Sequence, residues 1–96
     1  MSEQFVRFDA ADFLKTPAEM AAYLDACFEE DAGDGVLIRA ALNDIARAQG
    51  MTRIARDAGL GRESLYKALS STGNPEFATI MKVMKALGLR LHAIAV

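Results

Sequence analysis

The chain has 96 residues, of which 52% are hydrophobic and 25% are charged, and its formal net charge is −2. This size and composition predict one globular domain over residues 1–96 that can bury a core without disulfide or metal staples. They exclude a membrane-spanning protein, because no apolar run approaches the roughly 20 residues of a transmembrane helix. The start, MSEQFVRF, lacks the layout of a signal peptide, so we expect a cytoplasmic protein.

The charges divide unevenly along the chain. Residues 1–34 carry two basic and nine acidic side chains, a net charge of −7, whereas residues 35–96 carry nine basic and four acidic side chains, a net charge of +5. A basic surface attracts a polyanion through counterion release, and an acidic surface repels it. The two parts therefore predict two different partners, with a merely solubilising acidic surface as the alternative.

The first expected elements are a short arm and a helix. Phe5, Val6 and Phe8 form an aromatic run that suits a strand or an extended arm laid on the core. Thr16-Pro17-Ala18-Glu19 has the pattern of a capping box with proline in the first turn, which predicts a helix over residues 17–30. Its expected core face consists of Met20, Leu24, Cys27 and Phe28.

The end of this helix is acidic, because Glu29, Glu30 and Asp31 follow one another where the helix dipole disfavours negative charge. Such a helix end either binds a cationic partner or frays into solvent. A loop over residues 31–35 comes next, and Asp34 is expected to cap a helix that runs to Gln49. The expected core stripe of that helix is Ile38, Ala41, Leu42 and Ile45, with Arg39 and Arg47 outside.

Two short helices, over residues 51–58 and 62–70, are predicted to form a helix-turn-helix pair. Gly59 stands at the turn, where a positive φ is needed and only glycine adopts it without a Cβ clash. Leu60 closes the gap beneath the turn. The inner faces are formed by Ile54, Ala55, Ala58, Leu65 and Leu69.

The outer face of the second short helix combines hydrogen-bond donors with an aromatic ring. Its residues are Arg62, Glu63, Ser64, Tyr66 and Lys67. This composition favours a DNA-reading helix over the alternative of a plain pair of core helices joined at a glycine corner.

The last helix is expected to start at Pro75, with Asn74 as its cap, and to stop at Gly88. Its expected core face is Phe77, Ile80, Met81, Met84 and Leu87, while Lys82 and Lys85 point away. Residues 89–96 then suit a strand of uneven alternation. Because a lone strand leaves its backbone unpaired, this one must pair with the Phe5 to Phe8 run or with the same strand of a second subunit.

No constellation for catalysis or metal binding is evident. The chain has one cysteine and one histidine, far apart in sequence, and its glycines lie singly at helix ends rather than in a phosphate-binding loop. We therefore expect no enzyme activity, no cofactor, no metal site and no small-molecule ligand.

The segments FDAADFL and, above all, GRESLYKALSSTGNPEFATIMKVMKALGL carry a family resemblance. From Phe8 to Leu91 the chain resembles the HigA-type addiction-module antidote (antitoxin) proteins, a branch of the Cro/repressor-like helix-turn-helix superfamily. The resemblance implies an all-α, five-helix lambda-repressor-like domain with a short C-terminal strand. Where the family commonly has serine as the cap of the recognition helix, this chain has Gly61.

The resemblance further implies an antitoxin that binds a RelE/ParE-like toxin and, as a homodimer, represses its own operon at a palindromic double-stranded DNA operator. In this reading Arg62 and Lys67 reach guanine edges or phosphates, Glu63 a cytosine amine, Ser64 either base and Tyr66 a thymine methyl. Arg53 and Arg56 would face the phosphate backbone.

The expected toxin-binding residues lie in the acidic front of the chain and are Phe5, Phe8, Asp25, Glu29 and Glu30. Two alternatives differ in class. A free-standing transcriptional regulator would use the same DNA surface without a toxin, and a pure protein-interaction module would show no salt-sensitive DNA binding.

Overall fold

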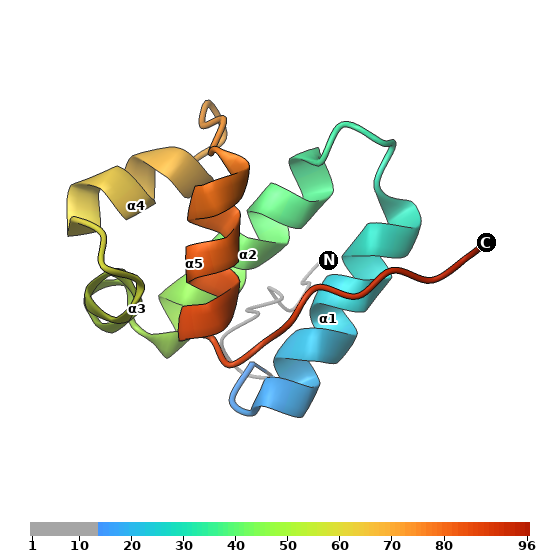
Figure 1. Ribbon diagram of the computed structural model, residues 1–96, viewed down its shortest axis with the longest axis horizontal. Helices are drawn as coiled ribbons and strands as arrows, with labels where there is room; N and C mark the ends of the chain where they lie inside the picture. Colours follow the sequence, from blue (N-terminus) through green and yellow to red (C-terminus); the bar gives the residue numbers. More distant parts are fainter. Residues whose placement is uncertain (1–13) are drawn as a thin grey trace, which may run out of the picture.

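The computed structural model describes residues 14–96, and within that range the regular structure consists of five α-helices (Figure 1). They are α1 (Pro17–Glu30), α2 (Val36–Gln49), α3 (Met51–Ala58), α4 (Arg62–Leu69) and α5 (Phe77–Ala86). The expected all-α architecture and the helix count are confirmed for this range. The arm containing Phe5 and Phe8 lies outside the described residues, and no helix within them is long and apolar enough to cross a membrane.

The helices are arranged around α2. It packs along α1 and also contacts α3 and α4, while α5 packs against α3 (Figure 1). The largest fully buried side chains come from α2, α3, α4 and α5 and from the segment just before α1. They are Leu14, Leu42, Ile45, Ile54, Leu65, Leu69 and Val83. One hydrophobic core therefore joins α1 and α2 to the short α3–α4 pair.

The start of α1 has the capping box that its sequence predicts. Thr16 Oγ1 accepts a hydrogen bond from the Glu19 N–H at 3.2 Å, and Glu19 Oε1 accepts one from the Thr16 N–H at 3.0 Å. Backbone donors at Lys15 and Thr16 lower the pKa of Glu19, because they stabilise its ionised form. Pro17 occupies the first turn, where its missing N–H costs nothing.

The loop between α1 and α2 is held mainly by Asp31. Its carboxylate accepts hydrogen bonds from the N–H groups of Gly33, Gly35 and Leu37 at 2.8 to 3.0 Å. These bonds, that from Gly35 first among them, lower the pKa of Asp31. Asp34 Oδ1 accepts from the Val36 N–H at 3.1 Å, but the cap residue of α2 is Gly35, so the prediction that Asp34 caps α2 is partly right.

The turn between α3 and α4 is built as expected on Gly59, whose φ is 72°. The N–H of Gly59 donates to Arg56 O at 3.1 Å and that of Leu60 to Ala55 O at 2.8 Å, which closes the C-terminus of α3. Ile54, Ala55, Leu65 and Leu69 are buried between the helices. Gly61 precedes α4 in an extended conformation and supplies no side-chain cap.

The core faces of α1 and α5 differ from the expected ones. On α1, Met20 and Leu24 are buried, but Cys27 is only half-buried and Phe28 is 44% exposed. On α5, Met84 and Leu87 are buried, whereas Phe77 is 70% exposed and Met81 is 41% exposed. The buried stripe of α5 runs instead through Ile80, Val83, Met84 and Leu87, which is the i, i+3, i+4, i+7 spacing of one helix face.

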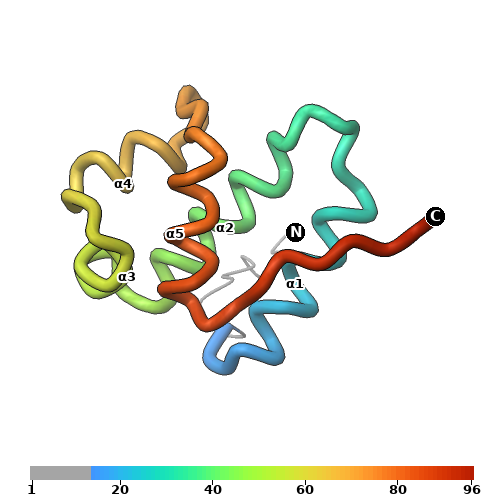
Figure 2. Tube along the Cα trace, viewed as in Figure 1, coloured from blue at the N-terminus to red at the C-terminus, as the bar shows by residue number. Residues whose placement is uncertain are grey.

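The bounds of α5 and the C-terminal strand also need correction. The helix starts at Phe77 with Glu76 as its cap residue, so Asn74 and Pro75 belong to the preceding loop. Gly88, with φ 78°, ends it as expected. Residues 89–96 contain no strand; they form an irregular extended segment that crosses α1 (Figure 2). The expected strand is not found within residues 14–96. Both partners expected for it, the Phe5 to Phe8 run and a second subunit, lie outside the described chain.

Gly73 is a steric requirement that the sequence did not reveal. A Cβ atom at this position would overlap the carbonyl oxygens of Lys67 and Ala68 in the last turn of α4. The Gly73 N–H also donates to Ser70 O at 2.9 Å. The loop after α4 therefore lies against the end of that helix, at a distance that only glycine allows.

Gly73→Ala should lower the free energy of unfolding by about 1 to 3 kcal/mol, since the added methyl group has rigid backbone rather than a flexible side chain to displace. Gly61→Ser is the matched control. It adds a hydroxyl at an extended cap position, where the new Cβ would lie 3.6 Å from Ser64 Oγ. It should raise the free energy of unfolding by about 0.3 kcal/mol. Urea unfolding measures both, and equal effects of the two substitutions would contradict the steric account.

Candidate functional site

The outer surface of α3 and α4 carries every described residue that the sequence assigns to DNA. All seven of these side chains are exposed: Arg53, Arg56, Arg62, Glu63, Ser64, Tyr66 and Lys67. The burial of Leu65 and Leu69 fixes which face of α4 is turned to the core, and so leaves the five α4 residues of the set outward. The structure therefore exposes all seven side chains on the helix pair.

Arg62 and Tyr66 form a pair one helical turn apart on this surface. The Arg62 guanidinium carbon lies 5.7 Å from the centroid of the Tyr66 ring, within the range of a cation–π contact. The contact holds both side chains along the outer face of α4. A flat ring and a planar donor group are thus presented together to solvent.

The two arginines of α3 have different surroundings. Arg53 Nη2 donates to Gln49 Oε1 at 2.9 Å, and Gln49 Nε2 donates in turn to Leu14 O at 2.7 Å. Arg56 Nε lies 3.5 Å from Asp57 Oδ1 in an exposed ion pair. Arg53 is therefore oriented by neutral partners and keeps its full charge, while part of the Arg56 charge is offset.

Arg39 is the residue that sequence reasoning missed at this site. Although it was expected on the outside of α2, it is partly buried, and its Nη1 donates to Leu69 O at 3.1 Å and to Ser70 O at 2.5 Å. These carbonyls end α4, where the helix dipole favours a positive charge. Arg39 therefore fixes the end of α4 against α2, and no local pattern could have shown a contact across 30 residues of sequence.

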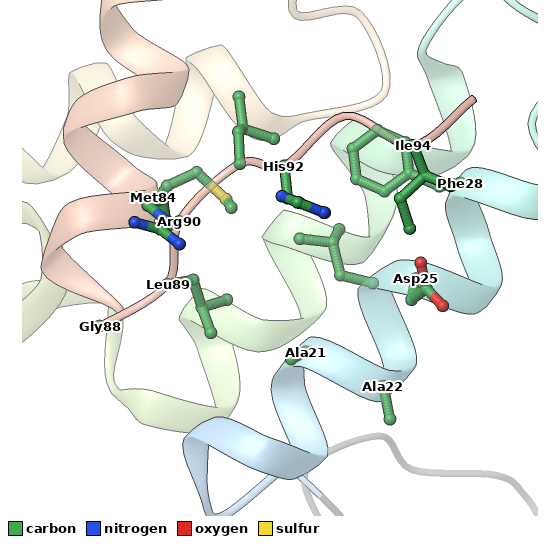
Figure 3. Close-up of a pocket in the computed structure, with 12 residues that line it drawn as sticks. Ala21, Ala22, Asp25, Phe28, Met84, Gly88, Leu89, Arg90, His92 and Ile94 are labelled. Carbon is green, nitrogen blue, oxygen red and sulfur yellow. The ribbon is translucent and has the colours of Figure 1, made fainter.

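The acidic residues of α1 lie on a different part of the surface. Asp25, Glu29 and Glu30 are all exposed, and none of them has a cationic partner within residues 14–96. A groove of about 490 Å³ lies between α1 and the C-terminal segment, and Asp25 and Phe28 line one wall of it while Arg90, His92 and Ile94 line the other (Figure 3). The expected partner residues Phe5 and Phe8 lie outside the described chain.

A polar contact fastens α1 to α2 beside this groove. Tyr23 Oη donates to Asp44 Oδ2 at 2.7 Å, and burial together with this carboxylate raises the pKa of Tyr23 to about 12. Burial also raises the pKa of the Cys27 thiol, which is therefore not an activated nucleophile. Within residues 14–96 no group of three or more His, Cys, Asp or Glu side chains could hold a metal ion.

Comparison with known proteins places the chain in a family. The family model described as "Probable addiction module antidote protein" matches residues 4–95. An "Uncharacterized protein" of Haemophilus influenzae (strain Rd) is 57% identical over 92 residues, which cover 96% of this chain and 93% of that protein. No solved structure matches the chain significantly.

The different environments of the arginines predict different effects on stability. Arg62→Ala should change the free energy of unfolding by less than about 0.5 kcal/mol, because an exposed cation–π pair contributes little. Arg39→Ala should cost about 1 to 3 kcal/mol, because it leaves two helix-end carbonyls without their charged donor. Urea titration of both variants tests this. A loss at Arg62 as large as that at Arg39 would show that Arg62 is structural.

Proposed function

The chain belongs to the family of probable addiction module antidote proteins, and from this we propose that it is a DNA-binding antitoxin. It neutralises a toxin by direct binding, and it binds its own operator as a homodimer to repress the operon. The family implies the toxin partner. The DNA operator, the dimer and the RelE/ParE-like class of the toxin are our proposals.

The observation that carries the DNA-binding proposal is the outer surface of α3 and α4. Arg53, Arg62 and Lys67 are exposed there, and within residues 14–96 none of them is paired with a carboxylate. Because two short helices are joined by a tight glycine turn, the arrangement has the proportions of a helix-turn-helix motif, with α4 as the recognition helix. An outward helix with free cations is what entry into a major groove requires.

Each side chain of α4 then has a chemical role. Arg62 and Lys67 donate to guanine edges or phosphates, and Glu63 accepts from a cytosine amine. Ser64 can donate or accept, and Tyr66 contacts a thymine methyl group. Arg53 and Arg56, on α3, contact the phosphate backbone, with Arg53 the stronger contributor because no carboxylate of residues 14–96 offsets its charge.

The toxin-binding proposal rests on α1. It carries three exposed acids, Asp25, Glu29 and Glu30, and the exposed ring of Phe28. A toxin of the ribonuclease type carries cations to hold RNA, so an acidic surface can steer the encounter and cover that site, while apolar anchors hold the complex. Phe5 and Phe8 are proposed as further anchors from the sequence alone. This surface is separate from α4, so DNA binding does not need it.

Arg62→Ala and Lys67→Ala should each weaken operator binding by about 1 to 3 kcal/mol and relax the preference at one base pair, since each removes a base contact. Arg53→Ala should weaken binding to operator and random DNA alike, because phosphate contacts carry no sequence information. Fluorescence anisotropy with both duplexes measures these affinities.

Lys15→Ala is the control for this series, since Lys15 is exposed at the start of α1, and it should leave both affinities unchanged. The affinity of the unmodified protein should fall with salt with a slope of about −0.9 per neutralised phosphate. Flat binding across the salt range, or equal losses on operator and random DNA for all three variants, would refute sequence reading by α4.

Reversal of Asp25, Glu29 and Glu30 to lysine should slow association with the protein encoded beside this one and weaken its neutralisation. The physical reason is that charge steering turns into repulsion. Fold and operator binding should persist, since all three side chains are exposed and lie away from α4. Stopped-flow or surface-binding kinetics give the association rate.

A single-residue pair controls for total charge. Glu29→Lys should slow association, whereas Glu76→Lys, an exposed reversal at the start of α5, should slow it much less. An association rate unaffected by the triple reversal, with the loss appearing instead in the Arg62→Ala variant, would assign the toxin contact to α4 and refute the role of α1.

A further inference from the structure

Within residues 14–96, the backbone hydrogen-bonding groups of residues 90–96 have no partner. The last backbone bond of the chain within residues 14–96 is that from the Leu89 N–H to Met84 O, at 2.9 Å. Beyond it the segment is extended and lies on the surface across α1 (Figure 2). Such a segment is an unpaired strand edge, and an edge of this kind accepts another strand through main-chain hydrogen bonds.

Two side chains of the same segment, at alternate positions, are apolar and largely exposed. Ile94 is 74% exposed, and Val96 is fully exposed. An isolated exposed aliphatic residue needs no explanation, but two in alternate positions of one extended edge provide one apolar face of a strand. Ile94 also lines the groove against α1, but at 74% exposure most of its surface has no cover within the described chain.

A matching apolar groove lies on the other side of the segment, next to α5. It has a volume of about 430 Å³, and its walls are Met81, Met84, Leu89 and Leu91, with Lys82, Lys85 and Arg90 at the rim. Met81, 41% exposed, is therefore an exposed side chain with a recess beside it. The chain thus carries both an apolar projection, at Ile94, and an apolar recess, beside Arg90.

We propose that residues 89–95 pair antiparallel with the same residues of a second copy, so that Ile94 of each copy enters the groove beside Arg90 of the other. The interaction is self-complementary, as a two-fold dimer interface must be. It rests on the homodimer of the proposed function and adds the surface through which that dimer forms. The outward faces of α4 and the acids of α1 remain free for other partners.

Symmetry fixes the register of this pairing. Residues directly opposite in an antiparallel pair point to the same side of the sheet. A two-fold axis perpendicular to the sheet must therefore lie midway between the two copies of one residue, which is paired with itself. If His92 is the self-paired residue, Arg90 of one copy lies opposite Ile94 of the other. This register brings the Ile94 side chain to the groove beside Arg90. The two Arg90 residues are then separated by about 13 Å along the strands, which limits their repulsion.

Symmetric cross-linking tests this register directly. In a Cys27→Ala background, His92→Cys should give a disulfide-linked dimer on mild oxidation, because the Cα atoms of a self-paired residue lie about 4.5 to 5.5 Å apart, within disulfide range. Arg90→Cys should not cross-link with itself, but Arg90→Cys combined with Ile94→Cys should. Val36→Cys, exposed on α2, is the control for random collision and should stay uncross-linked.

Sedimentation equilibrium of Ile94→Asp supplies a second arm without a new cysteine. The unmodified chain should be a dimer, and Ile94→Asp should raise the dissociation constant about tenfold or more, since a carboxylate is poorly solvated in an apolar groove. Val36→Asp, at an exposed aliphatic position on α2, should leave the constant unchanged. Far-UV circular dichroism should show the same helix content for all three proteins.

The outcomes separate this inference from the proposed function. A dimer that forms normally with Ile94→Asp and does not cross-link through His92→Cys would overturn the interface while leaving the homodimer standing. A monomer at all concentrations would overturn the homodimer of the proposed function and this inference together. Loss of the dimer by Ile94→Asp with cross-linking at His92→Cys supports both.

Discussion

The attachment of α4 to the rest of the molecule is the constraint on which the structure depends. A helix of eight residues is too short to be stable alone in water, so its order must come from tertiary contacts. Leu65 and Leu69 bury its inner face, and Arg39 holds its last carbonyls against α2. Gly73 brings the following loop onto the same end. These contacts determine which face of α4 reaches solvent.

The consequence is a molecule with two surfaces of opposite charge built on one core. The long helices α1 and α2 form one side, where the acids of α1 and Phe28 are exposed. The short pair of α3 and α4 forms the other side, where Arg53, Arg62 and Lys67 are exposed without a carboxylate partner in residues 14–96. The core that joins them is continuous. An antidote that binds a cationic toxin and a polyanion at once needs this separation. If acidic and basic side chains were mixed on one surface, that surface would attract neither partner strongly.

Local signals predicted the elements well. The capping box at Thr16 and Glu19, the glycine turn at Gly59 and the glycine stop at Gly88 act within a few residues, so the sequence alone places the helix ends they control. The exposed residues of α3 and α4 follow from the same local periodicity. Their assignment to DNA stays a proposal, since periodicity shows which face is outward and not what the face binds.

The features that the sequence did not predict depend on distant parts of the chain. Arg39 looked like a surface residue because its partners at Leu69 and Ser70 are distant in sequence. The rotation of α5, which exposes Phe77 and buries Val83, is set by how α5 meets α3 and not by its own pattern. The C-terminal strand is not found within residues 14–96, because a strand is defined by its partner and the described residues contain none for it.

Amide chemical-shift mapping by NMR tests the central claim, that one small domain presents two separate binding surfaces. Spectra of the labelled protein would be recorded alone, with operator DNA, and with the neighbouring gene product. The account predicts that DNA perturbs the amides of α3 and α4 and that the toxin perturbs those of α1. Perturbation of the same residues by both ligands, or no perturbation of α4 by DNA, would contradict it.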